Sequence, residues 1–210
     1  PNGADPRMFD PSASGAEFRQ QHGLEGKFVA LYAGAHGMSN DLGVVLAASQ
    51  RLAHRPDIAI VLLGDGKEKP NLVRQAAELG LSNVTFIPPI SKLNMPSALA
   101  AADACIAILK PIELYKTTYP NKVFDYMAAS RPVVLAIEGV ICEVIESVQA
   151  GIPVKPGDPQ AMARAIQALA DDRQAATSMG QRGRLYIETH FDRSKLADQL
   201  EMLLQQLVHP

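Results

Sequence analysis

A strand and a helix are expected in succession in the segment DIAIVLLGDG, residues 57–66, followed by EKPNLVRQAAELG, residues 68–80. Its first part is an apolar run bounded by polar residues and glycine, which is typical of a strand buried on both faces. Its second part has apolar residues at helical spacing and ends at a glycine, a residue that commonly closes helices. A buried strand followed by such a helix is the unit of a parallel sheet covered by helices on both sides.

The same unit recurs along the chain. Apolar runs predict further strands at 27–34, 83–88, 132–137 and 152–158, and residues 97–109 are expected to turn from helix to strand near Asp103. Helical spacing predicts helices at 41–55, 121–130, 141–151, 159–172, 173–191 and 193–208. This alternation predicts an α/β protein with a doubly wound, Rossmann-like parallel sheet.

Composition narrows the class of function. The 210 residues, 47% of them hydrophobic, suffice for one domain or slightly more, and a net charge of -2 disfavours nucleic acid as a partner. No run of about 18 apolar residues occurs, so no membrane-spanning helix is expected. Cys105 and Cys142 lack metal-ligand spacing and are expected to be small core residues in a reducing cytoplasm.

A glycine-containing loop follows the first expected strand. In parallel sheets ligands bind beyond the carboxyl ends of the strands, and glycines there let backbone N–H groups approach a phosphate. Gly34, His36 and Gly37 occupy this place in the sequence GAHG. A tight turn without ligand is an equally simple explanation, and His36 could either donate to a phosphate or lie on the surface. The dinucleotide fingerprint G-x-G-x-x-G is missing here, which disfavours an NAD(P) oxidoreductase.

The stretch YKTTYPNKVFDYMAASRPVVLAIEG, residues 115–139, gathers polar groups at the start of an expected helix. The N–H groups of Asn121, Lys122 and Val123 are expected to be free to bind an anion, helped by the helix dipole and by the Lys122 charge. Asp125 lies one turn on, where a carboxylate suits two ribose hydroxyls better than phosphate. The pattern indicates a nucleotide diphosphate, although a solvated first helical turn is the simpler alternative.

Other catalytic motifs are missing from the sequence. It has no D-x-D pair, no H-E-x-x-H, no G-x-S-x-G and no P-loop, and its histidines are scattered. We therefore predict neither a metal site nor a cofactor.

Seven segments together resemble a known family, in the right order and over essentially the whole chain. The chain is similar to the C-terminal, donor-binding half of retaining glycosyltransferases of the GT-B fold, the glycosyl transferases group 1 type that acts in bacterial lipopolysaccharide and capsule synthesis. The segments are PNGADPRMF (1–9), LYAGAHGMSNDLGVVLAAS (31–49), LLGDGKEKPNL (62–72), NVTFIPPI (83–90), AAADACI (100–106), PNKVFDYMAASRPVVLAIEG (120–139) and AGIPVKPGDPQAMARAI (150–166).

The resemblance implies roles for individual residues. The family motif Glu-x7-Glu ends on the acid that holds the ribose, and by position this acid is Asp125. The loop N–H groups near Gly37, and those near Asn121 and Lys122, would hold the diphosphate. The backbone around Ile87 would contact the edge of the base.

Two positions depart from the family pattern. The first acid of the motif, which touches the donor sugar in relatives, falls here on Thr117, so the sugar stays open. The Arg and Lys that many relatives carry after the first strand fall on Ala35 and Asn40. Another cation must then neutralise the diphosphate, and we expect Lys122 first and Lys116 second.

The resemblance also implies partners and a reaction. A metal-independent transfer with retention would move a sugar from a nucleotide diphosphate to a cell-surface polysaccharide or lipid-linked acceptor, as in O-antigen, capsule or lipopolysaccharide synthesis. Uridine is the expected base, and an N-acetylated or deoxy amino sugar is one option for the sugar. The acceptor domain would precede this chain, so the isolated domain is expected to be inactive. The full-length enzyme would be cytoplasmic, with association at the inner face of the membrane left open. A nucleotide-sugar epimerase of the same architecture and a non-catalytic binding domain remain alternatives.

The expected domain boundaries follow the same resemblance. Residues 1–12 would be an interdomain linker, residues 13–191 the nucleotide-sugar-binding domain, and residues 192–210 a helix that crosses to the missing domain. Leucines at helical spacing give that last helix an apolar stripe, namely Leu196, Leu200, Leu203, Leu204 and Leu207. The stripe packs either on its own domain or on a partner that this chain lacks.

Overall fold

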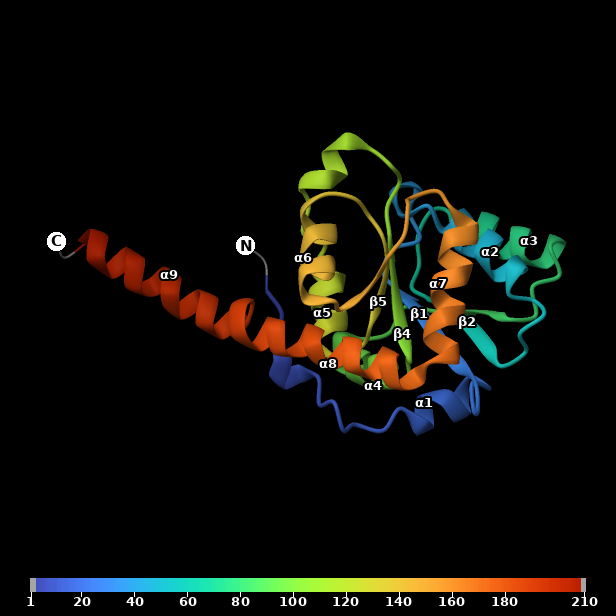
Figure 1. Cartoon of the computed structure of the whole chain (residues 1–210), viewed down its shortest axis with the longest axis horizontal. Helices are drawn as coiled ribbons and strands as arrows, with labels where there is room; N and C mark the ends of the chain where they lie inside the picture. Colours follow the sequence, from blue (N-terminus) through green and yellow to red (C-terminus); the bar gives the residue numbers. More distant parts are fainter. Residues whose placement is uncertain (1–2, 209–210) are drawn as a thin grey trace.

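The computed structural model describes residues 3–208, and side chains up to residue 206. Its centre is a six-stranded parallel sheet of order β3-β2-β1-β4-β5-β6, which confirms the expected doubly wound α/β fold (Figure 1). The strands are β1 Phe28–Ala33, β2 Ile58–Leu63, β3 Val84–Ile87, β4 Ala104–Ile108, β5 Val133–Ala136 and β6 Gly151–Pro153.

The strand order reverses beside β1. From β1 the chain winds outward through β2 to β3, and it then returns to β4, which pairs with β1 on the other side. The crevice at such a reversal, outside the carboxyl ends of the strands, is where doubly wound sheets bind ligands. The loops that leave β1 and β4 therefore flank this crevice.

Every residue of β1, β2, β4 and β5 is buried, because helices cover both faces of the sheet. One face packs against α2 (Leu42–Arg51), α3 (Lys69–Glu78) and α7 (Pro159–Asp171). The other face packs against α1 (Ala16–Gln21), α4 (Met95–Ala100), α5 (Asn121–Ala128) and α6 (Val140–Val148). The long helix α8, Arg173–His190, contributes residues to both cores.

Most differences from the sequence prediction concern element ends. The last expected strand, 152–158, is only Gly151–Pro153, because this edge strand pairs with β5 alone over three residues. Helix α1 was not predicted, since its six residues are too few for a periodic pattern. Cys105 is fully buried, which confirms the prediction of a core residue, whereas Cys142 is only half-buried. Both thiols are free.

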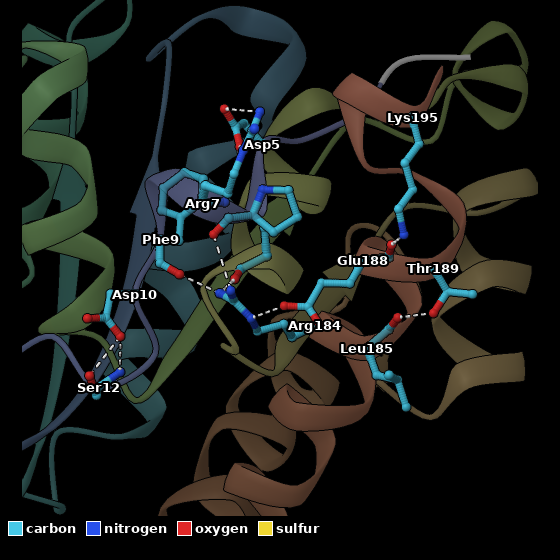
Figure 2. Close-up of polar contacts among 12 residues, drawn as sticks. Asp5, Arg7, Phe9, Asp10, Ser12, Arg184, Leu185, Glu188, Thr189 and Lys195 are labelled. Carbon is cyan, nitrogen blue, oxygen red and sulfur yellow. Dashed lines mark hydrogen bonds and ion pairs between the residues drawn. The ribbon is translucent and has the colours of Figure 1, made fainter. Parts of the chain in front are cut away.

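The N-terminal segment is tied to the end of α8. Ala4 is fully buried; its N–H donates to the Phe191 carbonyl at 3.1 Å, and the Arg193 N–H donates to the Ala4 carbonyl at 2.8 Å. Figure 2 shows Arg184 of α8 reaching this segment, where its guanidinium donates to the Phe9 carbonyl while Glu188 accepts at 2.7 Å. The expected linker is thus anchored to the domain at this point.

The last helix, α9 (Arg193–Val208), points away from the rest of the molecule (Figure 1). Leu200, Leu203 and Leu204 are 59%, 59% and 53% exposed, so this part of the stripe does not pack on its own domain. The Leu207 side chain lies outside the described residues. Among residues 3–208, no helix has the length and apolar character needed to cross a membrane.

Candidate functional site

The loops after β1 and β2 form one rigid frame at the carboxyl edge of the sheet. The Gly34 N–H donates to the Leu63 carbonyl at 3.0 Å, and the His36 N–H donates to the Asp65 carbonyl at 2.7 Å. A Cβ atom on Gly64 would collide with the Gly34 carbonyl oxygen, so glycine is required where the two loops touch. These contacts tie the predicted GAHG loop to the loop that follows β2.

Lys122 reaches this frame from the first turn of α5. Its Nζ donates to the Tyr32 hydroxyl at 2.9 Å and lies 4.1 Å from the centroid of the Tyr32 ring. A Cβ atom on Gly34 would stand 2.7 Å from the same Nζ. Gly34 is therefore the residue that leaves room for the ammonium group, and the structure brings these two predicted residues together.

Burial controls the charge of Lys122. It lowers the pKa of the ammonium group to about 8, because water no longer solvates the charge. The Tyr32 hydroxyl, which accepts from Lys122, donates in turn to the Ala35 carbonyl at 2.7 Å, and burial raises the pKa of Tyr32. Tyr32 thus remains a neutral hydroxyl that orients the lysine.

His36 lies beneath the loop. Its side chain is fully buried, and neither ring nitrogen has a hydrogen-bond partner among the described residues. Burial lowers its pKa, and the charge of Lys69 acts in the same direction. The imidazole is therefore neutral near pH 7, with one N–H donor available. The alternative of a surface histidine is wrong, because the side chain is fully buried. The ring centroids of Tyr32 and Phe86 lie 6.1 and 6.3 Å from that of His36.

Lys69 is a cation of this edge that the sequence analysis missed. Its Nζ donates to the Gly64 carbonyl at 2.7 Å, and its charge acts on His36. The signal was present in GDGKEK, residues 64–69, where a lysine follows a glycine turn at a strand end. That stretch also resembles an ordinary turn entering a helix, so its lysine did not stand out.

The predicted anion donors are present in part. The backbone N–H groups of Gly37, Asn121 and Lys122 have no hydrogen-bond partner within residues 3–208. The expected N–H of Val123 is not available, because it donates to the Pro120 carbonyl at 3.0 Å. Pro120 precedes α5, so Asn121 and Lys122 are its first two residues. The N–H groups at the start of a helix have no partner within the helix and are open to an anion.

Asp125 lies one turn further along α5. It is half-buried, and its carboxylate accepts no hydrogen bond from the part of the chain that the structure describes. Burial raises its pKa, while the charges of Arg193 and Lys92 oppose this shift. A carboxylate without internal partners, on the same helix as Lys122, is available to ligand hydroxyl groups.

Lys116 and Thr117 are not joined to the group around Gly34. Lys116 pairs with Glu113 at 2.9 Å and with Glu138 at 3.6 Å, and the Glu113 carboxylate raises its pKa. The Thr117 hydroxyl donates to the Leu114 carbonyl at 3.0 Å. The charge of Lys116 is therefore already balanced by carboxylates, whereas no carboxylate lies within ion-pair distance of Lys122 in residues 3–208.

The predicted contact of Ile87 with a base stays a prediction. Ile87 is buried, and its carbonyl already accepts from the Gly64 N–H at 2.9 Å. Pro88 and Pro89, which follow it, have no backbone N–H. Donors for a base in this segment can therefore come only from residues beyond Pro89.

Similar proteins are glycosyltransferases. Alpha-D-kanosaminyltransferase from Streptomyces kanamyceticus is 25% identical over 94% of this chain and 50% of its own length. The putative colanic acid biosynthesis glycosyl transferase WcaI from Escherichia coli is 26% identical over 68% of this chain and 35% of its own. The chain thus spans half or less of these relatives.

Solved structures share the fold. Anabaena Alr3699/HepE in complex with UDP has a TM-score of 0.86 at 22% identity, over 97% of this chain and 56% of that one. The C-terminal domain of LpcC, a glycosyl transferase group 1 family protein from Francisella tularensis, has a TM-score of 0.78 at 21% identity, over 91% of this chain and 100% of that domain. Residues 27–172 match the family described as Glycosyl transferases group 1. With the fold of a GT-B half and a family match over most of its length, this chain belongs to the glycosyl transferases group 1 family.

Proposed function

We propose that this chain is the donor-binding half of a retaining, metal-independent glycosyltransferase that uses a UDP-linked sugar. The observation that carries the proposal is the position of Lys122. Its ammonium group lies beside Gly34 at the sheet switch point, without a carboxylate partner in residues 3–208, and the helix that carries it begins with two open N–H groups. A half-buried cation beside free backbone donors suits a diphosphate.

The proposed chemistry uses these groups on the leaving diphosphate. As the bond between sugar and phosphate breaks, negative charge grows on the phosphate oxygens. Lys122, the Asn121 N–H and the Gly37 N–H would stabilise that charge, and preorganised donors of this kind lower the barrier for charge development. We also assign to His36, whose neutral ring has no hydrogen-bond partner among the described residues, the role of one further N–H donor to the diphosphate.

The remaining parts of the donor follow from the same arrangement. Asp125 would accept hydrogen bonds from the ribose, because its carboxylate has no partner within the described chain. The backbone beyond Ile87 would contact the base. Support for uridine comes from the similar fold of Alr3699/HepE, whose structure contains UDP, and support for an amino sugar comes from the kanosaminyltransferase relative.

The acceptor and the cell compartment also belong to the proposal. Because the chain spans about half of its relatives, acceptor recognition is assigned to a further domain of the whole protein, and the isolated chain would bind donor without transferring it. The colanic acid and lipopolysaccharide core names among the relatives support a cell-surface polysaccharide or lipid-linked acceptor, which implies cytoplasmic synthesis at the inner membrane face.

Two measurements test the proposal. Calorimetric titration of this chain should show that UDP binds more tightly than uridine and that Lys122→Met removes most of the difference. The full-length protein with a UDP-sugar and excess chelator should then give a product with the anomeric configuration of the donor. Equal affinities for UDP and uridine, or loss of activity on chelation, would contradict the diphosphate site or the metal-independent reaction respectively. Release of an epimerised nucleotide sugar without acceptor would favour an epimerase instead.

A further inference from the structure

A polar cavity lies at the edge of the sheet opposite the Gly34 loop. It has a volume of about 170 Å³, and its lining includes Phe28, Asp103, Arg131 and Arg173. Phe28 begins β1, Asp103 precedes β4, and Arg131 precedes β5, so the cavity lies at the amino ends of the strands. The strands separate it from the Gly34 loop, and a donor bound at the carboxyl edge cannot fill it.

Arg131 is a half-buried cation in this cavity that forms no ion pair within residues 3–208, although the charge of Asp103 acts on it. Its Nε is buried and has no hydrogen-bond partner among the described residues, and no carboxylate of residues 3–208 forms an ion pair with it. Burial lowers its pKa, yet a guanidinium keeps its proton at any physiological pH. A buried charge without a partner is costly, whereas one that meets an anion is stabilised.

The nearby carboxylate cannot balance Arg131, because Asp103 is already engaged. Its Oδ2 accepts from the Val29 N–H at 2.7 Å and from Arg19 at 2.8 Å, and its Oδ1 lies 4.0 Å from Arg173. Three guanidinium groups thus surround one carboxylate. This excess of positive charge favours an anion in the cavity.

Arg173 places a second guanidinium at the mouth of the cavity. Its side chain is 54% exposed, and its Cζ lies 5.6 Å from the centroid of the Phe28 ring, which fixes the group over an apolar surface. Ser130 and Gln181 line the same cavity and add a hydroxyl and an amide donor. Planar guanidinium groups match the oxygens of phosphate in pairs of parallel hydrogen bonds.

We propose that the cavity between Arg131 and Arg173 binds a small tetrahedral oxyanion of the phosphate class, at a site separate from the donor site. Asp103 fixes Arg19 and the start of β1, while Arg131 and Arg173 hold the anion between the ends of β4, β5 and α8. The site belongs to this domain alone and does not depend on the proposed transfer reaction.

Nuclear magnetic resonance of the arginine side chains tests the proposal on the unmodified chain, with inorganic phosphate as the probe. The Nε–H signals of Arg131 and Arg173 should shift and saturate together as phosphate is added, while the signal of Arg51, which does not line the cavity, serves as a control. Absence of a saturable shift at Arg131 would overturn the proposal.

Variants separate this site from the donor site. Calorimetric titration with phosphate should show at least about tenfold weaker binding to Arg131→Met or to Arg173→Gln, since hydrogen bonds to charged groups contribute this much. Lys122→Met should keep the phosphate binding that reports on Arg131, and Arg131→Met should keep the UDP affinity of the unmodified chain. Phosphate binding that is lost in Lys122→Met but kept in both arginine variants would refute the second site. Arg173 is 54% exposed, so Arg173→Gln should leave the fold intact. This variant therefore tests the proposal even if Arg131→Met does not fold.

Discussion

Binding of UDP to this chain should take up protons above pH 7 because of Lys122. The pKa of Lys122 is lowered to about 8 by burial, and a diphosphate beside its Nζ must raise that pKa by favouring the charged form. Raising a pKa on binding means proton uptake, so UDP affinity must fall as pH rises through the pKa of the free protein. The direction follows from the geometry, since the ammonium group stands at the proposed diphosphate position.

The size of the effect follows from the same value. With a pKa of about 8, roughly a tenth of the lysines are uncharged at pH 7, about half at pH 8 and about nine tenths at pH 9. If the bound pKa lies well above 9, proton uptake equals these fractions, and UDP affinity falls roughly tenfold between pH 7 and pH 9. The terminal phosphate of UDP loses its last proton near pH 6, so its own titration does not interfere.

Calorimetry in pairs of buffers with different ionisation enthalpies measures the number of protons taken up at each pH. Lys122→Met should abolish the uptake between pH 8 and pH 9 and weaken UDP at pH 7 by about tenfold to a hundredfold, the cost of a charged hydrogen bond. Lys116→Met is the matched control, because the pKa of Lys116 is raised by Glu113 and this lysine stays charged throughout. Unchanged proton uptake in Lys122→Met, or none in the unmodified chain at pH 8.5, would refute the assignment of Lys122.

Three further predictions follow from the same structure. Asp125→Ala should weaken both UDP and uridine by about tenfold to a hundredfold in a titration, because it removes a charged acceptor for ribose, and equal affinity in both proteins would exclude Asp125 from the site. Tyr32→Phe keeps the ring below Lys122 but removes the hydroxyl that orients it, so it should weaken UDP while uridine binds as before; an unchanged UDP affinity would show that this hydrogen bond does not position the lysine. Hydrogen exchange in α9 should be fast unless copies associate, and Leu200→Glu with Leu203→Glu should lower any association seen by light scattering without changing the melting temperature; strong protection in a clean monomer would contradict this.

The fold class, and the edge of the sheet where the candidate site lies, could be predicted from sequence patterns. Buried strands have continuous apolar runs, and helices have apolar residues three or four positions apart. These local patterns therefore predicted nearly all helices and strands. Doubly wound sheets bind ligands at one kind of place, and Gly34, Lys122 and Asp125 could therefore be chosen from strand and helix ends. Helix α1 escaped prediction because six residues carry too little periodicity, and the edge strand β6 was predicted at 152–158 but spans only Gly151–Pro153.

Contacts between segments that are distant in the sequence could not be predicted from local patterns and are seen only in the folded structure. Gly34 and Lys122 are far apart in the sequence, and nothing local indicates that one leaves space for the ammonium group of the other. The burial of His36, the balanced charge of Lys116 and the contribution of Lys69 likewise depend on which side chains surround each group. Charge and pKa are set by neighbours and by exclusion of water, which a linear sequence does not specify. Among residues 3–208, the fold leaves Lys122 without a carboxylate partner and pairs Lys116 with Glu113 and Glu138.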